Sequence, residues 1–98
     1  MLTLTIKKQW YDMILSGEKT EEYRDIKPYY TTRFKNNHLL RPNGLPNVGT
    51  KDICFRNGYS TESPSIVAEC YLSIGPGRTE WGAGPGTNYY ILHIVTIK

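Results

Sequence analysis

The densest group of charged side chains in the sequence contains Lys19, Glu22 and Arg24. If this segment is an extended strand, alternation of its side chains places Glu22 and Arg24 on one face, together with Thr20. Lys19 precedes the strand in a turn and can reach the same face. The pattern therefore predicts one cleft that contains a lysine, a carboxylate and an arginine.

Two kinds of chemistry suit such a cleft. Arg24 could hold a phosphate or a carboxylate, while Glu22 fixes the cations or accepts hydrogen bonds from the amino group of a base. Lys19 could instead act as a general base if Arg24 or burial lowers its pKa. Charged residues that alternate along one strand also form solvated, salt-bridged sheet faces, and the pattern alone leaves that alternative open.

The residues before this group predict a strand followed by a helix. Apolar residues alternate with threonine from Leu2 to Ile6, which is typical of a half-buried strand. From Lys8 to Ser16 the apolar residues recur at helical spacing, and Gly17 is placed to end the helix in a left-handed conformation. We therefore expect this helix to position Lys19 just after its C-terminus.

The rest of the chain predicts a small curved sheet. A short helical turn is expected after Pro28, and turn-forming residues from Asn36 to Thr50 predict an ordered loop. Further strands are expected at Lys51–Asn57, Ser65–Ile74 and Tyr89–Lys98, the first two as antiparallel neighbours. About five strands and one principal helix predict an α+β fold with a strongly curved sheet or barrel.

Length and composition limit the class of protein. The 98 residues correspond to a single domain, and 39% hydrophobic and 12% aromatic residues predict a folded one. No apolar run approaches the roughly 20 residues that span a bilayer, which together with the N-terminal charge pattern favours a soluble cytoplasmic protein. Twelve Lys and Arg against nine Asp and Glu permit an anionic partner but do not indicate a dedicated nucleic-acid binder.

The cysteines and histidines predict neither a metal site nor a cofactor. Cys54 and Cys70 lie in apolar segments without CxxC spacing, so both are expected to be buried thiols. Together with His38 and His93 they lack the paired spacing of a zinc site. His93 lies in the last predicted strand, where we expect a hydrogen-bonded structural histidine.

Two further segments combine aromatic and basic side chains. In the glycine-rich loop from Gly75 to Gly86, Trp81 could stack on a base as part of a mobile lid while Arg78 meets a phosphate. The alternative is that Trp81 caps one end of the sheet. The second segment interleaves the two residue types in the manner of a single-strand-binding surface, through Tyr29, Tyr30, Arg33 and Lys35. Packing of one tyrosine in the core, with the cations in solvent, is the alternative there.

The segment Gly17-x-Lys19-x-x-Glu22-x-Arg24, after a strand and a helix that ends in Ile-Leu-Ser-Gly, resembles the signature of the ASCH domain family. This family is related to the PUA RNA-binding domains. The resemblance is close from Met1 to about Arg24, whereas the later strands agree only in order and approximate length. It implies a small PUA-like β-barrel with flanking helices, whose Gly-Lys-Glu-Arg segment lines a cleft for RNA or a nucleotide.

The resemblance also implies possible enzyme chemistry. Some small bacterial ASCH proteins resemble amidohydrolases that remove the acetyl group from N4-acetylcytidine, using a lysine, a threonine three residues later and a distant glutamate. Lys19 matches that lysine, but Glu22 stands at the threonine position. Of Glu69 and Glu80, only Glu80 is placed in a loop from which it could reach a cleft. Other family members resemble metal-dependent ribonucleases.

The leading hypothesis is therefore an RNA- or nucleotide-binding domain, with RNA or a modified nucleoside as its partner. Its expected ligand-binding residues are Gly17, Lys19, Glu22, Arg24, Arg78 and Trp81. The first alternative is a nucleoside or RNA hydrolase in which Lys19 is the base and Glu22 its carboxylate partner. The second is a protein-interaction module whose exposed tyrosines contact a partner chain.

Overall fold

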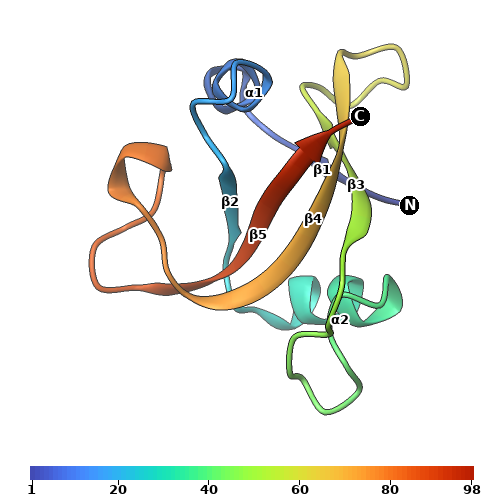
Figure 1. Cartoon of the computed structure of the whole chain (residues 1–98), viewed down its shortest axis with the longest axis vertical. Coiled ribbons are helices and arrows are strands. Elements are labelled where there is room, and N and C mark those ends of the chain that lie inside the picture. The colour runs from blue at the N-terminus through green and yellow to red at the C-terminus, as the bar shows by residue number, and fades with distance from the viewer.

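Five strands form one curled sheet that closes only halfway to a barrel (Figure 1). The computed structural model describes residues 1–98. The strands are β1 (Leu2–Thr5), β2 (Glu21–Arg24), β3 (Lys51–Arg56), β4 (Ser65–Pro76) and β5 (Asn88–Ile97). Their order in the sheet is β1-β3-β4-β5-β2, so β1 and β2 are its two edges. The fold is α+β with a strongly curved sheet, as the sequence predicts.

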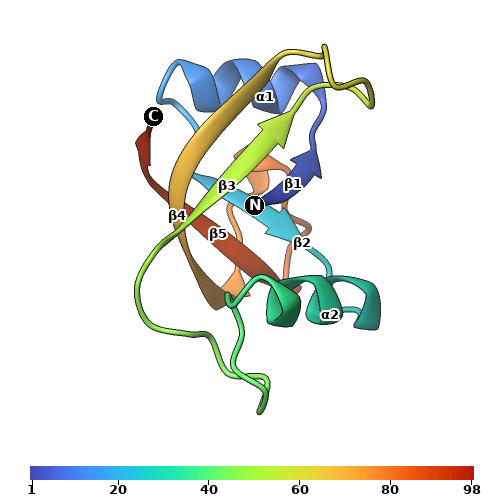
Figure 2. The ribbon, with the colours of Figure 1, turned by 90° about the vertical axis from the view of Figure 1, so that its right-hand side faces the viewer.

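Two α-helices lie at opposite ends of the molecule (Figures 1 and 2). Helix α1 (Lys8–Leu15) joins β1 to β2, and helix α2 (Pro28–Asn36) follows β2. Pro28 begins α2, where its missing N–H removes no helical hydrogen bond. The short turn expected after Pro28 is thus a helix of nine residues. A third, 3-10 helix, η1 (Thr79–Trp81), lies between β4 and β5.

The strand pairs combine one parallel and three antiparallel contacts. Strands β1 and β3 are parallel, with Leu2 opposite Ile53. Strands β3 and β4 are antiparallel neighbours, which confirms the prediction, and β4 also pairs with β5. The register of β4 and β5 shifts between Glu69 and Cys70, and such a bulge bends a strand and increases its twist. The two longest strands can therefore curl around the core.

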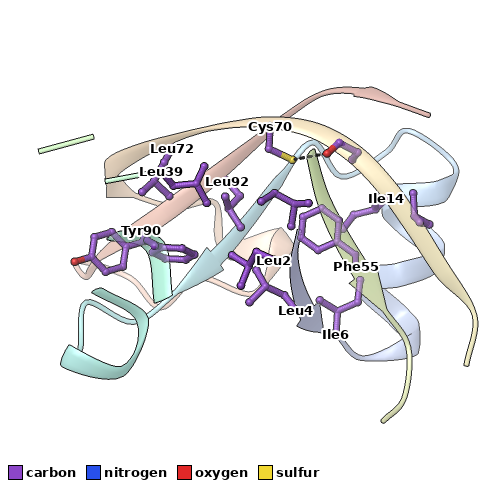
Figure 3. Close-up of a cluster of buried hydrophobic side chains, with 14 of the residues drawn as sticks. Leu2, Leu4, Ile6, Ile14, Leu39, Phe55, Cys70, Leu72, Tyr90 and Leu92 are labelled. Carbon is purple, nitrogen blue, oxygen red and sulfur yellow. Dashed lines mark hydrogen bonds between the residues drawn. The ribbon is translucent and has the colours of Figure 1, made fainter. Parts of the chain in front are cut away.

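The main hydrophobic core lies inside the curl of the sheet (Figure 3). Alternation directs Leu2 and Leu4 of β1 into it, while Ile14 of α1 and Phe34 of α2 enter from the two ends. Cys70 is fully buried there, and burial raises the pKa of its thiol from 9.0 to about 12. Both cysteines are free and buried, as expected.

The inward face of β4 leaves the core before the strand ends. Leu72 is buried, whereas Ile74, which the alternation assigns to the same face, is 43% exposed. Ile74 is exposed because β4 continues past the core. The segment from Asn36 to Thr50 is an ordered loop that places Leu39 and Leu40 in the core.

A second, smaller cluster covers the opposite face of β2 and β5. It consists of Tyr23, Trp81, Ala83 and Ile91. Tyr23 is paired with Ile91 across the two strands, so both side chains point to this face. None of the helices has the length and apolar character needed to cross a membrane.

Candidate functional site

The two edge strands, β1 and β2, face each other across an open seam. Each has a neighbouring strand on one side only. Arg24 of β2 donates a hydrogen bond from Nη2 to the carbonyl oxygen of Thr5 at 3.0 Å, and Arg33 of α2 donates from Nη2 to that of Thr3 at 3.1 Å. The two guanidinium groups thus donate hydrogen bonds to carbonyl oxygens on the open edge of β1, which would otherwise need a further strand as their partner. The seam, defined by Thr3 to Thr5 on one side and Arg24 on the other, is therefore lined by cations.

The end of α1 directs Lys19 toward this seam. Gly17 adopts the left-handed conformation, with φ at 85°, which the sequence predicts. The N–H of Lys19 then donates to the carbonyl oxygen of Met13 at 3.0 Å, so the chain turns back beneath the helix. Gly17 therefore acts through its backbone conformation, which directs the chain so that Lys19 can reach the site.

The side chain of Lys19 is completely buried. Its Nζ donates hydrogen bonds to the carbonyl oxygens of Glu21, at 2.5 Å, and Trp81, at 3.1 Å, and lies 3.0 Å from Oε1 of Glu22. A lysine ammonium has three N–H groups, so these three acceptors satisfy it. Lys19 therefore ties η1 to β2 and fixes the position of Glu22.

Two aromatic rings flank the same ammonium. Nζ of Lys19 lies 5.2 Å from the ring centroid of Trp10 and 4.9 Å from that of Tyr23. Burial lowers the pKa of Lys19 from its ordinary 10.5, and the negative charge of Glu22 opposes that shift. The site thus contains a lysine that deprotonates more readily than one in water.

Glu22 lies between two cations. Its Oε1 faces Lys19, and its Oε2 is 3.0 Å from Nη1 of Arg24, which also donates to the carbonyl oxygen of Tyr23. The side chains of Glu22 and Arg24 are 6% and 13% exposed. The predicted grouping of Lys19, Glu22 and Arg24 is therefore confirmed, and the alternative of a solvated sheet face is wrong because the group is buried.

A cavity of about 290 Å³, which we call the inner cavity, opens beside this group. Glu22 and Arg24 form its polar wall, and Trp10, Tyr30 and Trp81 contribute aromatic side chains. Three of the five N–H groups of Arg24 have the partners already described, so two remain for a ligand. Glu22 likewise keeps unused lone pairs on both oxygens. The inner cavity therefore offers a hydrogen-bond acceptor beside a donor.

The other expected site residues lie elsewhere. Lys19 sits behind the wall formed by Glu22 and does not line the inner cavity. Gly17 and Arg78 are exposed and are also not among its lining residues. Arg78 instead forms an ion pair with Glu80 at 3.0 Å, which keeps both side chains outside the cavity. Direct ligand contact in the inner cavity is thus limited to Glu22, Arg24 and Trp81 among the residues expected from the sequence.

The glycine-rich loop is packed against the protein rather than standing open as a lid. Trp81 is only 8% exposed and lies in the cluster with Tyr23 and Ile91. Gly82 follows with φ at 102°, and a Cβ at this position would lie 3.0 Å from the ring of Trp10. Glycine therefore lets the loop approach α1 closely. Burial of Trp81 and the hydrogen bond from Lys19 to its carbonyl favour the alternative, in which Trp81 caps one end of the sheet.

Seven of the ten residues that line the inner cavity are not among the expected ligand-binding residues, and Trp10, Tyr30 and Lys7 are three of them. Trp10 has helical spacing with its apolar neighbours, which indicates packing and gives no sign of a cavity. Tyr30 carries a signal, because it belongs to the segment that interleaves aromatic and basic residues. No sequence pattern predicts that Lys7 lines the cavity. It lies there because β1, which precedes it, is an edge strand.

A separate polar cluster surrounds His93 on β5. Nε2 of His93 and Oγ of Ser73 are 2.6 Å apart, and the ring of Tyr71 stacks on the imidazole at 4.4 Å. Nδ1 lies 3.8 Å from Oε2 of Glu21, which is too long for a hydrogen bond. The expectation of a hydrogen-bonded histidine is confirmed. None of these four residues lines a cavity.

No group of three or more His, Cys, Asp or Glu side chains is placed to hold a metal ion. No protein-family model matches the chain, and comparisons with curated proteins and with solved structures find no match. The ASCH resemblance therefore stays a prediction that rests mainly on the segment from Gly17 to Arg24.

Proposed function

We propose that the protein is an RNA- or nucleotide-binding domain of the ASCH type, with a PUA-like half-barrel, and that its inner cavity binds a base. One observation carries the proposal: the carboxylate of Glu22 and the guanidinium of Arg24 lie 3.0 Å apart on the wall of a cavity with aromatic sides. Burying charge costs free energy, and the hydrogen-bonding capacity that Glu22 and Arg24 keep at the cavity wall would offset part of this cost on binding a polar ligand.

The order of acceptor and donor suits particular bases. A carboxylate accepts hydrogen bonds from an exocyclic amino group, and a guanidinium donates to the neighbouring ring nitrogen or carbonyl oxygen. Cytosine and adenine each have an amino group beside an acceptor. Uracil carries a carbonyl oxygen where cytosine carries the amino group, so in the orientation that brings this position of the base to Glu22 two acceptors would face each other. We propose that the base binds with its amino group at Glu22, and in that orientation the pairing favours cytosine or adenine over uracil.

The other walls support the same ligand class. Trp10 and Tyr30 offer ring surfaces on which a base can stack, as aromatic residues do in proteins that bind single-stranded RNA. Lys7 is exposed at the rim and forms no ion pair, so its charge is free to meet a phosphate. The net charge of +3 favours a polyanion in the same direction.

Mapping of NMR shifts onto labelled protein tests this proposal. Cytidine monophosphate should shift the indole N–H of Trp10 and the backbone amides of Glu22 and Arg24. The variant Arg24→Lys keeps the positive charge but loses the planar pair of donors, so it should weaken binding at least about fivefold. Shifts that map away from the inner cavity, or an affinity that Arg24→Lys leaves unchanged, would contradict the assignment.

The second candidate function is hydrolysis of an acylated nucleoside. The lowered pKa of the buried Lys19, with Nζ 3.0 Å from Glu22, is the observation that favours it. Because Lys19 does not line the inner cavity, it would act through Glu22. Glu22 would take a proton from water as the water oxygen attacks the acetyl carbonyl of N4-acetylcytidine. Glu22 would then return this proton to N4 of the base as the bond between N4 and the acetyl carbon breaks, giving cytidine and acetate.

Release of acetate from N4-acetylcytidine, followed by proton NMR, separates the two functions. An enzyme would release acetate at a rate that Glu22→Gln abolishes and that depends on pH. Binding without acetate release leaves the first proposal as the function. Circular dichroism first establishes that Glu22→Gln is folded, because this substitution leaves Lys19 and Arg24 without their carboxylate partner.

A further inference from the structure

A larger cavity of about 640 Å³, which we call the outer cavity, adjoins the inner one along the seam. The two cavities share five lining residues: Thr5, Ile6, Lys7, Arg24 and Tyr30. The outer cavity continues from them toward α2 and the loop between β3 and β4. The two cavities are therefore immediate neighbours along the seam, separated by no element of the fold.

The charged side chains of the outer cavity are all cations. They are Lys7, Arg24 and Arg33, and no acidic residue lines this cavity. Lys7 and Arg33 form no ion pair, and Nε of Arg33 is buried without a hydrogen-bond partner. Cations without counterions along a groove attract the phosphates of a strand.

Tyrosine rings stand among these cations. Tyr59 is 93% exposed and Tyr29 is 63% exposed. Burial of such large rings would normally stabilise the folded protein. The guanidinium of Arg33 lies 5.4 Å from the ring centroid of Tyr29, and Tyr29 packs edge-on against Tyr30 at 5.0 Å. Exposed rings beside unpaired cations are the combination on which successive bases of a single strand stack.

We propose that the outer cavity binds the nucleotides next to the base held in the inner cavity, so that the seam holds a short single strand of RNA. The inference rests on the proposed function, because it takes the inner cavity as the site of one base. In this arrangement Tyr29 and Tyr59 stack on the neighbouring bases, while Lys7 and Arg33 contact the phosphates. The ligand is then a strand of RNA rather than a free nucleotide.

Binding of two ligands to three variants tests the inference. The ligands are cytidine monophosphate and a single-stranded RNA tetranucleotide that contains one cytidine among uridines. Tyr59→Ala and Tyr29→Ala alter only the outer cavity, and the exposure of both rings means that neither change should unfold the protein. Tyr71→Ala is the matched control, because Tyr71 is 43% exposed and lies outside both cavities.

The tetranucleotide should bind wild-type protein at least about fivefold more tightly than the mononucleotide. Tyr59→Ala and Tyr29→Ala should each weaken tetranucleotide binding by about fivefold or more and leave mononucleotide binding unchanged. Tyr71→Ala should change the binding of neither ligand. If the mononucleotide binds but the tetranucleotide is no tighter, or if the two variants change nothing, the inference is wrong while the proposed function stands. If neither ligand binds, both are wrong.

Discussion

At the residue scale, the central finding is that Lys19 is a positioning residue. Its ammonium has three acceptors, on Glu21, Trp81 and Glu22, and its side chain has no exposed surface. Motif reasoning places a lysine of this kind in contact with the ligand. The structure instead places Glu22 at the cavity wall and Lys19 behind it, where the lysine holds the carboxylate in place.

Replacing Lys19 by methionine should destabilise the fold by about 3–5 kcal/mol. Methionine keeps most of the side-chain volume, but it removes one of the two cations that neutralise Glu22. It also leaves the carbonyl oxygens of Glu21 and Trp81 without the donor that Lys19 provides. The free energy of unfolding in urea measures this loss. Lys51→Met is the control, because Lys51 is exposed and forms no ion pair, and it should change stability by less than about 0.5 kcal/mol. A loss below about 1 kcal/mol for Lys19→Met would contradict the role given to this residue.

Stability should fall at alkaline pH because of Cys70. Burial raises the pKa of this thiol from 9.0 to about 12, so above about pH 9 the unfolded chain loses the proton while the folded chain keeps it. The contribution is constant below about pH 9 and is lost as the pH rises toward 12. Wild type should therefore lose about 2 kcal/mol relative to Cys70→Ala between about pH 8 and pH 10.5. Parallel pH profiles of unfolding free energy for the two proteins would refute this.

At the element scale, the junction between α1 and β2 builds the site. The strand from Leu2, the helix from Lys8 and the left-handed Gly17 could all be predicted, because each is a local pattern of apolar spacing or backbone preference. The length of α2 could not, since Pro28 marks where a helix can begin, whereas the left-handed residue just after its end is His38, with φ at 61°, and not a glycine. The packing of Trp81 depends on contacts with segments far away in sequence, so local composition suggested a lid instead.

Gly17→Ala should destabilise the protein by about 1 kcal/mol. Open space surrounds the position, so the cost comes from φ at 85°, which residues with a Cβ adopt reluctantly. Gly17→Asn should cost less, because asparagine tolerates the left-handed conformation better than alanine does. Thermal unfolding of the two variants ranks them. An asparagine variant less stable than the alanine variant would show that the backbone conformation is not the cause.

At the scale of the whole molecule, the site exists because the barrel does not close. The order β1-β3-β4-β5-β2 leaves two edges that meet across the seam, and both cavities lie there. The number of strands and the curvature could be predicted from the sequence. The strand order could not, because no local pattern encodes which edges approach each other. For this reason the sequence does not predict three residues that line the cavities, namely Lys7, Trp10 and Tyr59.

Binding of single-stranded RNA should weaken as salt is added. The inference places phosphates at two cations of the seam, Lys7 and Arg33, and each phosphate contact on a single strand contributes about −0.7 to the slope of log K against log salt concentration. The expected slope is therefore about −1.4, for two phosphates. Titrations at several salt concentrations give it. A slope near zero would show that phosphates do not meet these cations, and Lys7→Gln should make the slope shallower by about 0.7.

The most direct test of the account is the ratio of the dissociation constants of cytidine and uridine monophosphate, measured by calorimetry under one set of conditions. The two ligands carry the same phosphate and sugar, so their difference reports the contact of the base with Glu22 and Arg24. The account predicts that cytidine monophosphate binds at least about fivefold more tightly. Equal affinities, or tighter binding of uridine monophosphate, would show that Glu22 and Arg24 do not recognise the amino group of cytosine.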